Sequence, residues 1–503
     1  METCLSRRNF VAAAAAGIAA AGLGTQVALA DEAEAVATDA EAEESQTDEQ
    51  EEETVVYMTF NGGELTAAEQ HALLDEYDWR TGQLTAADII EAAKDVTDAE
   101  CEEILFNEPE ITEDYTLSDG TVVPAVYIAL RNRINRIGQG LGNEVTDDAW
   151  TFLMKQFDEE EAAFYLKMPM FRYFNAEEAG EYADVDEDYA EEMCSELSYR
   201  GLMNRVTRAG INYYHLLAFA HGMLEFKMNE YYDDDFVTDI FAMLGSDYGY
   251  ETRNLGSAMY FTLPVSKDIV TDTEIVPYCD WEKIIERNTI LSVSPCQCRT
   301  FTPIRSGIEV GTLCDHPMET CISTGEQAQY YIENGVGRQI DQEEAREIVQ
   351  NGVDAGLVLQ IMNSKHCDVI CQCHGDCCAL LKGYLSLDGD SENLNYISYY
   401  QLDVDYDKCI QCGACAEQCP MFTITMDEET GYPVVGNLCV RCGQCCTVCP
   451  AGARTLSKRP DEEWFELPYD MLNDYYVKAM ERARRGYIVD FVPSAATESV
   501  TEE

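Results

Sequence analysis

CIQCGACAEQCP (residues 409–420) returns 30 residues later as CVRCGQCCTVCP (residues 439–450). Both runs space their cysteines as C-x2-C-x2-C-x3-C and follow the last one with proline. Gly413 and Gly443 occupy the same place in each run, where a side chain is expected to crowd a group bound inside the loop. The two runs are therefore an internal duplication, and the C-terminal part of the chain is expected to fold around them.

This spacing predicts two cuboidal [4Fe-4S] clusters. Three closely spaced thiolates wrap one cube, while the fourth, followed by proline, projects toward the other cube. Disulfides and zinc sites also use paired cysteines, but neither needs a duplicated run with both prolines. Cys446 lies outside the pattern and is expected to pack as a small side chain. The expected ligand sets are Cys409, Cys412, Cys415 with Cys449, and Cys439, Cys442, Cys445 with Cys419.

Residues 401–458 resemble a bacterial two-cluster ferredoxin along their whole length. The resemblance implies one-electron transfer at low potential, with the two clusters near enough to relay electrons. A two-[4Fe-4S] ferredoxin domain is therefore expected at residues 401–460.

A second group of nine cysteines lies between residues 296 and 378. Their CxC and CC pairs chelate poorly as single tetrahedral zinc sites and suit cuboidal iron-sulfur sites. Zinc held by four cysteines, or by three with His316, His366 or His374, is the alternative. Residues 330–360 are expected to form two helices, the second capped by Asp341, that bring the cysteine groups together. The predicted metal ligands are Cys296, Cys298, Cys314, Cys321, Cys367, Cys371, Cys373, Cys377 and Cys378.

The N-terminus is typical of an export signal. Arg7 and Arg8 precede an alanine-rich apolar run, and residues 28–30 (ALA) form a small-residue cleavage site. The motif Ser-Arg-Arg-x-Phe resembles the twin-arginine signal, which implies export of a folded protein that already holds its cofactor. Residues 1–30 are therefore predicted as a twin-arginine signal peptide, and the protein is placed in the periplasm or at the extracytoplasmic face.

Charge and hydropathy exclude several partners. The chain has 33 Lys plus Arg against 94 Asp plus Glu, so that its net charge is -61. Nucleic acid and anionic lipid would repel such a protein, and protein redox partners are expected instead. No segment reaches the roughly 20 apolar residues of a membrane span, which leaves only peripheral association with a membrane. Residues 31–54, acidic and without aromatics, are predicted to be a disordered linker.

The N-terminal half is predicted to be mainly helical. Thr66, Thr85 and Thr97 each begin a capping box within residues 55–165. Arg131, Arg133 and Arg136 are expected on a solvated helix face, paired with carboxylates.

Residues 166–232 carry a helix capped by Asn175, a second helix, and a hairpin turning at 209–210. This order resembles a winged helix. Because the presumed recognition helix is acidic, the module is expected to dock partners rather than to bind DNA.

The order of these parts resembles a group of anaerobe iron-sulfur proteins. They join a winged-helix-like N-terminal part, a CxCR…C…C…CxC…CC region and a two-cluster ferredoxin. The match covers residues 125–460, including KQFDEEEAAFYLKMPMFRYFNAEEAG at 155–180. It implies further iron-sulfur ligation at residues 233–400. Beyond the match, residues 461–503 are expected to form a C-terminal helix and tail. The expected fold class is α+β and multidomain.

The sequence thus predicts an exported iron-sulfur electron-transfer protein. It would relay single electrons through [4Fe-4S] clusters as a partner or subunit of an anaerobic reductase. The alternative is that the chain is itself the reductase, with substrate at an open iron of a middle-region cluster. His316 and His374 are then the candidate proton donors, and no catalytic residue is assigned. A metal sensor that uses the winged helix is a third hypothesis.

Overall fold

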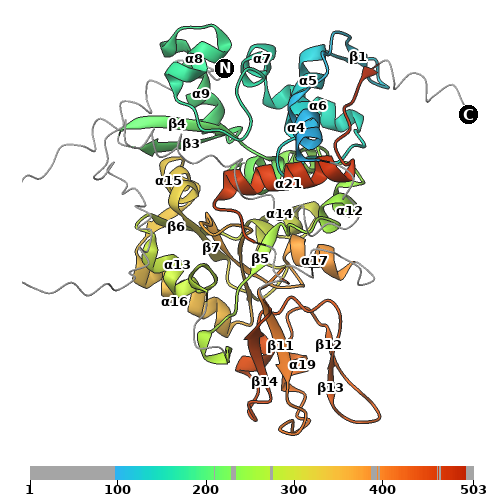
Figure 1. The fold of residues 1–503 in the computed structure, drawn as a ribbon, viewed down its shortest axis with the longest axis vertical. Coiled ribbons are helices and arrows are strands. Elements are labelled where there is room, and N and C mark those ends of the chain that lie inside the picture. Colours follow the sequence, from blue (N-terminus) through green and yellow to red (C-terminus); the bar gives the residue numbers. More distant parts are fainter. Residues whose placement is uncertain are drawn as a thin grey trace, which may run out of the picture. The chain divides into compact units, whose positions relative to one another are not determined.

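The computed structural model describes residues 97–208, 210–227, 234–271, 276–386, 394, 397–460, 463 and 466–493 (Figure 1). All of them belong to one unit, Tyr57–Glu503. The predicted signal peptide, the acidic linker and the capping boxes at Thr66 and Thr85 lie outside the described residues. Helices and strands are mixed along the described chain, in agreement with the predicted α+β class.

Four helices open the described chain, and the side chains of Thr97, Thr146 and Asp158 cap the starts of three of them. The capping box predicted at Thr97 is confirmed: the Thr97 hydroxyl accepts from the Glu100 amide at 3.3 Å, and the Glu100 carboxylate accepts from the Thr97 amide at 2.8 Å. Asp158 caps the last of these helices in the same way. The elements are α4 (Asp98–Phe106), β1 (Tyr115–Thr116), β2 (Val122–Val123), α5 (Ala125–Asn135), α6 (Asp147–Gln156) and α7 (Glu159–Tyr165).

Two helices and a hairpin follow, in the predicted order. Asn175 and Glu178 form the predicted capping box. The antiparallel strands pair from Met203 with Leu216 to Arg208 with Ile211, so the chain turns at the predicted place. The winged-helix resemblance of this module stays a prediction. The elements are α8 (Ala176–Ala183), α9 (Glu187–Tyr199), β3 (Met203–Arg208) and β4 (Ile211–Leu216).

The prediction of a solvated arginine face on α5 is wrong for two of its members. Arg131 and Arg136 are each 2% exposed. Arg131 donates to the carbonyl oxygen of Gly142, and Arg136 forms an ion pair with Asp490. A buried guanidinium needs such acceptors. Here they come from a loop and from the distant C-terminal segment, so the periodicity of the helix could not reveal them.

A six-stranded antiparallel sheet forms the centre of the cysteine-rich region, in the order β5-β9-β10-β7-β6-β8. The expected second helix of the spacer is present, and Asp341 caps it. The sheet itself was not predicted, because its strands are short and pair across large separations, such as Thr262 with Gln360. The strands are β5 (Tyr260–Thr262), β6 (Leu291–Pro295), β7 (Glu319–Thr324), β8 (Arg338–Ile340), β9 (Val358–Met362) and β10 (Val369–Cys373).

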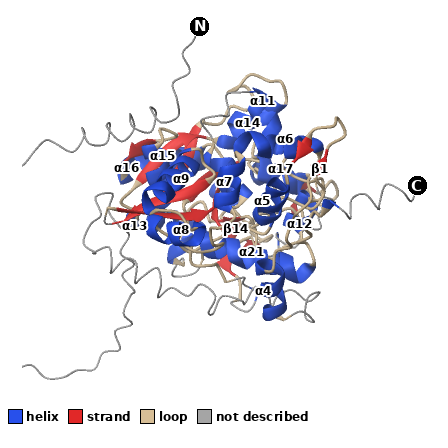
Figure 2. Cartoon of the chain, turned by 90° about the horizontal axis from the view of Figure 1, so that it is seen from above, coloured by secondary structure: helices blue, strands red, loops and turns tan. Residues whose placement is uncertain are grey.

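Helices cover the sheet and frame its cysteines. Helices α15 and α16 pack against β6 and β7, and Figure 2 shows both helices beside strands. Helix α14 begins at the first CxC pair, and α17 begins after the CC pair. The helices of this region are α10 (Leu224–Phe226), α11 (Asp234–Phe241), α12 (Tyr248–Arg253), α13 (Trp281–Arg287), α14 (Gln297–Arg305), α15 (Gly325–Glu333), α16 (Gln342–Asp354) and α17 (Ala379–Leu385).

The duplicated runs fold as two similar loops between two small sheets. Gly413 and Gly443 both adopt positive φ, at 78° and 86°. A Cβ at Gly443 would lie 2.3 Å from Ile269, whereas at Gly413 no protein atom comes nearer than 4.0 Å. A side chain at Gly443 would therefore clash with other protein atoms, whereas one at Gly413 would not. The positive φ favours glycine at both positions. The elements are β11 (Tyr400–Val404), α19 (Ala414–Glu417), β12 (Ile424–Met426), β13 (Pro433–Val435), α20 (Gln444–Thr447) and β14 (Arg454–Lys458).

Helix α21 (Met471–Arg485) returns the chain to the N-terminal helices, and nearly all of its side chains are buried. The Tyr475 hydroxyl donates to the carbonyl oxygen of His221 at 2.6 Å, and the Tyr476 hydroxyl donates to Glu102 of α4 at 2.9 Å. No helix within the described ranges combines the length and the apolar character needed to cross a membrane.

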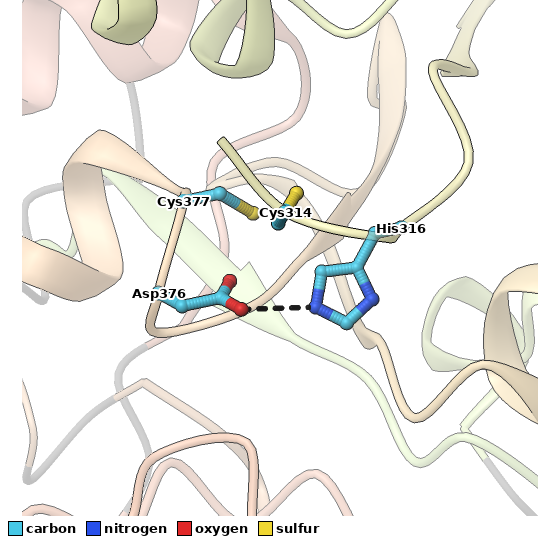
Figure 3. A group of neighbouring side chains, drawn as sticks. All are labelled: Cys314, His316, Asp376 and Cys377. Carbon is cyan, nitrogen blue, oxygen red and sulfur yellow. Dashed lines mark ion pairs between the residues drawn. The ribbon is translucent and has the colours of Figure 1, made fainter. Parts of the chain in front are cut away.

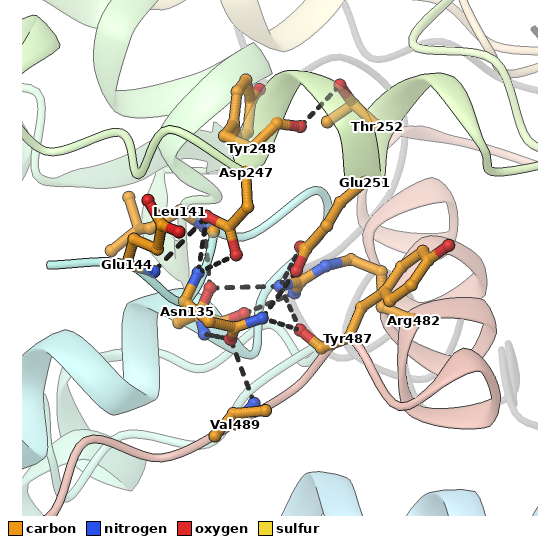
Figure 4. Close-up of polar contacts among 12 residues, drawn as sticks. Asn135, Leu141, Glu144, Asp247, Tyr248, Glu251, Thr252, Arg482, Tyr487 and Val489 are labelled. Atoms are coloured by element: carbon orange, nitrogen blue, oxygen red, sulfur yellow. Dashed lines mark hydrogen bonds and ion pairs between the residues drawn. The ribbon is translucent and has the colours of Figure 1, made fainter. Parts of the chain in front are cut away.

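Arg482 of α21 is the centre of a buried polar network (Figure 4). Its guanidinium donates to Glu251 at 3.2 Å, to the Asn135 side chain at 3.1 Å and to the carbonyl oxygen of Tyr487 at 3.1 Å. A Cβ at Gly140 would lie 2.3 Å from this guanidinium. The glycine-rich segment after α5 therefore serves close packing against the C-terminal helix.

Candidate metal centres

The cysteines of the duplicated runs line two separate cavities. Cys409, Cys412, Cys415 and Cys449 line one of them, together with Arg454. The other is lined by Cys419, Cys439, Cys442 and Cys445. Each expected ligand set thus surrounds its own cavity, and the fourth thiol of each run lies at the cavity of the other run.

Two residues outside the predicted sets tune these thiols. Cys446 is buried and lines neither cavity, but it donates a hydrogen bond to Cys445. That bond, with a smaller effect of Arg454, lowers the pKa of Cys445 to about 7 against the opposing effect of burial. Burial raises the pKa of Cys439 to about 11. The positive charge of Arg454 acts on Cys415 as well, so one buried cation serves thiols of both cavities.

Seven of the nine middle-region cysteines line a third cavity, of about 480 Å³. They come from the start of α14, from the neighbouring strands β7 and β10, and from the turn before α17. The sheet therefore joins the two groups that the sequence was expected to bring together. The seven are Cys296, Cys298, Cys321, Cys371, Cys373, Cys377 and Cys378.

Five of these cysteines form a continuous row, named here the thiol row: Cys296, Cys298, Cys378, Cys373 and Cys371. Side-chain hydrogen bonds join each to the next. Hydrogen bonds from Cys298 and Cys373 lower the pKa of Cys378 to about 5, although burial opposes the shift. Hydrogen bonds within the row, together with burial, instead raise the pKa of Cys296 and Cys373. It is the clustering of five sulfur donors, the ligand type of iron-sulfur clusters, that gives the row the character of a metal-ligand set.

Two predicted ligands lie outside this cavity. Cys367 is buried beside Cys279 and Arg287, where burial raises its pKa, and it does not line the cavity. Cys314 lies instead near His316, Asp376 and Cys377 (Figure 3).

The three histidines that the sequence offered as alternative ligands separate into two places. The rings of His316 and His374 are in contact, with centroids 4.4 Å apart and planes tilted by 46°. Burial, and then the charge of His374, lower the pKa of His316. His366 packs instead on Tyr469, at 4.4 Å between ring centroids.

Arg299, the arginine of the CxCR motif, joins the segments that carry the thiols. It is 1% exposed and donates to Pro317 O at 2.8 Å, Thr320 Oγ1 at 2.7 Å and Gln372 O at 2.9 Å. Its Nε lies 3.4 Å from Cys377 Sγ. Burial opposes its charge, but the nearby thiols Cys296 and Cys377 raise its pKa above the ordinary value.

The cavity also has a polar wall that the sequence did not indicate, formed by His221, Glu225, Tyr260 and Gln327. His221 Nδ1 lies 2.7 Å from the Tyr260 hydroxyl, and its Nε2 lies 2.7 Å from Gln327 Oε1. Glu225 lies 3.7 Å from His221 Nδ1. Burial and the charge of Cys371 raise the pKa of Tyr260 well above its ordinary value. These residues come from distant parts of the chain, so no local pattern marks them.

Residues 408–464 match the family model of the 4Fe-4S dicluster domain. The match includes both duplicated runs and all eight cysteines that line the two C-terminal cavities. No curated protein and no solved structure matches the chain. The C-terminal region is therefore an iron-sulfur, ferredoxin-like domain of the electron-transfer kind.

Proposed function

We propose that this protein is exported and relays single electrons as a partner or subunit of an anaerobic reductase. The observation that carries the proposal is the exchange of thiols between the duplicated runs. Each run places three cysteines at one cavity and its fourth at the other. The donor sets fit one [4Fe-4S] cluster each, and the shared segments would keep the clusters adjacent, as electron relay requires.

The middle cavity is proposed to hold at least one further iron-sulfur cluster. Its donors are the thiol row and Cys321, which faces Cys371 and Cys296. Cysteine sulfurs are the ligands that such clusters use, and six of them at one cavity suit that role. Held there, a cluster would extend the relay beyond the C-terminal domain.

The first test is iron, acid-labile sulfide and zinc per chain after anaerobic purification of the protein without residues 1–30. Two cubes supply about eight irons, and a further cube raises the value to about twelve. Twelve or more is the expected result. Eight would remove the middle cluster from the proposal, and iron without labile sulfide would overturn it altogether.

A matched pair of variants tests the ligand sets. Cys415→Ser should lower the iron content by up to about four per chain, because it removes a cluster thiolate. Cys446→Ser should leave iron unchanged, because Cys446 lines neither cavity and serine still donates to Cys445. Equal loss of iron in both variants would contradict the assigned sets.

The proposal of export has two supports, the paired arginines and the buried thiols. A cluster that is inserted in the cytoplasm stays bound if the protein is already folded when it is exported. Replacing Arg7 and Arg8 together by lysine should retain the iron-loaded chain in the cytoplasm. Cell fractionation of the double variant against the parent chain measures this. Unimpaired export of the double variant would contradict the twin-arginine route.

The polar wall favours a second candidate function, in which the chain is itself the reductase. The cavity extends past the thiols to Tyr260 and His221, so a small molecule at an exposed iron would meet a hydroxyl backed by an imidazole. Cyanide is a suitable probe, since it binds an open iron and accepts a hydrogen bond. It should alter the paramagnetic resonance spectrum of the middle cluster, and Tyr260→Phe should weaken its binding without loss of iron. A spectrum unchanged by cyanide would leave the relay as the function.

A further inference from the structure

Two loops bring four side chains of mixed chemistry together beside the cavity (Figure 3). Cys314 and His316 lie in the loop between α14 and β7, and Asp376 and Cys377 lie in the turn between β10 and α17. One ligand atom from each, namely two sulfurs, an imidazole nitrogen and a carboxylate oxygen, lies within 4.8 Å of all the others. We propose that these four residues bind one Zn²⁺ ion, separately from the iron-sulfur clusters.

The spacing of the donors fits a tetrahedral ion. A regular tetrahedron with edges of 4.8 Å has its centre about 2.9 Å from each corner, against zinc bond lengths of about 2.0–2.3 Å. The donors therefore need to approach the centre by less than about 1 Å each. Two thiolates, one imidazole and one carboxylate are all ligands that zinc accepts, and four of them close its coordination as in structural sites.

One contact between two of the donors, and further contacts with neighbouring groups, hold the four side chains in place. His316 Nε2 lies 3.3 Å from Asp376 Oδ2. The His374 ring contacts the His316 ring, with centroids 4.4 Å apart, and places its Nδ1 2.8 Å from the other oxygen of Asp376. Arg299 contacts Cys377 Sγ and donates to Pro317 O, so one buried cation links both loops. Such support of ligands by a second layer of residues is typical of metal sites.

The adjacent cysteines 377 and 378 are divided between two centres. Cys378 shares hydrogen bonds with Cys298 and Cys373 of the thiol row. Cys377 interacts with Arg299, Asp376 and Cys314. An ion at Cys377 would therefore anchor the turn that delivers Cys378 to the cavity. The proposed zinc is structural: with four protein donors it has no open position for a substrate.

X-ray absorption at the zinc edge tests the site without interference from iron. The full chain, purified anaerobically, should contain one zinc with two sulfurs at about 2.3 Å and two nitrogen or oxygen neighbours at about 2.0 Å. Absence of zinc, a shell of four sulfurs, or a shell of oxygen alone from an adventitious ion would each overturn the proposal. This readout does not depend on whether the chain relays electrons, so failure here leaves the proposed function standing.

Variants then assign the donors. His316→Ala should weaken zinc binding by more than the about 10–100-fold that loss of a supporting residue costs, with iron content unchanged. His366→Gln is the control, because His366 packs on Tyr469 away from the four donors, and it should retain zinc. Loss of iron instead of zinc in His316→Ala would assign these residues to a cluster and overturn the proposal. If His316→Ala fails to fold, the absorption spectrum of the unmodified chain still decides.

Discussion

Arg299→Met tests whether a single buried cation holds the middle region together. The guanidinium donates to Pro317 O, Thr320 Oγ1 and Gln372 O, at 2.7 to 2.9 Å, and contacts Cys377 Sγ. Methionine has a similar length and fills most of the space, so packing changes little. The substitution therefore isolates the loss of the charge and of its donors.

The magnitude follows from the acceptors left behind. Each buried oxygen without a donor costs about 1–3 kcal/mol, and three of them lose one. Removal of the guanidinium also relieves the cost of burying a charge, which opposes this loss. Three acceptors together would cost about 3–9 kcal/mol, and the relieved cost of the buried charge lowers this sum, so we expect the free energy of unfolding to fall by about 3–5 kcal/mol.

Urea unfolding of the anaerobically purified chain, followed by circular dichroism, measures the change. Arg305→Met is the matched control, since Arg305 lies in the last turn of the same helix, is exposed, and contacts the Phe241 ring with its guanidinium carbon 4.2 Å from the ring centroid. An exposed contact of this kind contributes about 0.5–1 kcal/mol. A loss in Arg299→Met no larger than in Arg305→Met would refute the reasoning. Arg299→Lys should fall between them, because one ammonium cannot reach all the acceptors.

Three further predictions concern stability. Arg482→Met should lower the free energy of unfolding by about 3–5 kcal/mol, because it removes the ion-pair partner of the buried Glu251 carboxylate. Lys155→Met, at an exposed ion pair, should lower it by less than about 1 kcal/mol, and urea unfolding compares the two variants. Burial lowers the pKa of His366 from 6.5 to about 4, so between these values the unfolded chain binds the extra proton and stability falls as pH decreases. His366→Gln should flatten that dependence in unfolding measured across the pH range, and an unchanged slope would contradict it. Asn175→Ala removes a helix cap and should cost about 1 kcal/mol, seen as a lower urea midpoint.

Features encoded within a few residues were predictable from the sequence. Each duplicated run is a short loop whose cysteine spacing can be read directly from the sequence. Residues 408–464, which contain both runs, match the 4Fe-4S dicluster domain. The capping boxes at Thr97 and Asn175 form hydrogen bonds within the first turn of the helix that each residue caps. The hairpin at 203–216 forms between strands that follow one another in the chain. In each case the partners are neighbours in the chain, so the residue pattern specifies the contact.

The middle region needed the tertiary structure. A sheet whose strands come from residues 260 to 373 decides which cysteines meet: it gathers seven at one cavity and leaves Cys367 beside Arg287. The polar wall joins His221 to Tyr260 and Gln327. Similarly, Arg136 is buried because Asp490 returns to meet it. Thiol spacing alone therefore predicted a metal-binding region, while long-range strand pairing determined which thiols gather at one cavity, since it joins residues that are far apart in the chain.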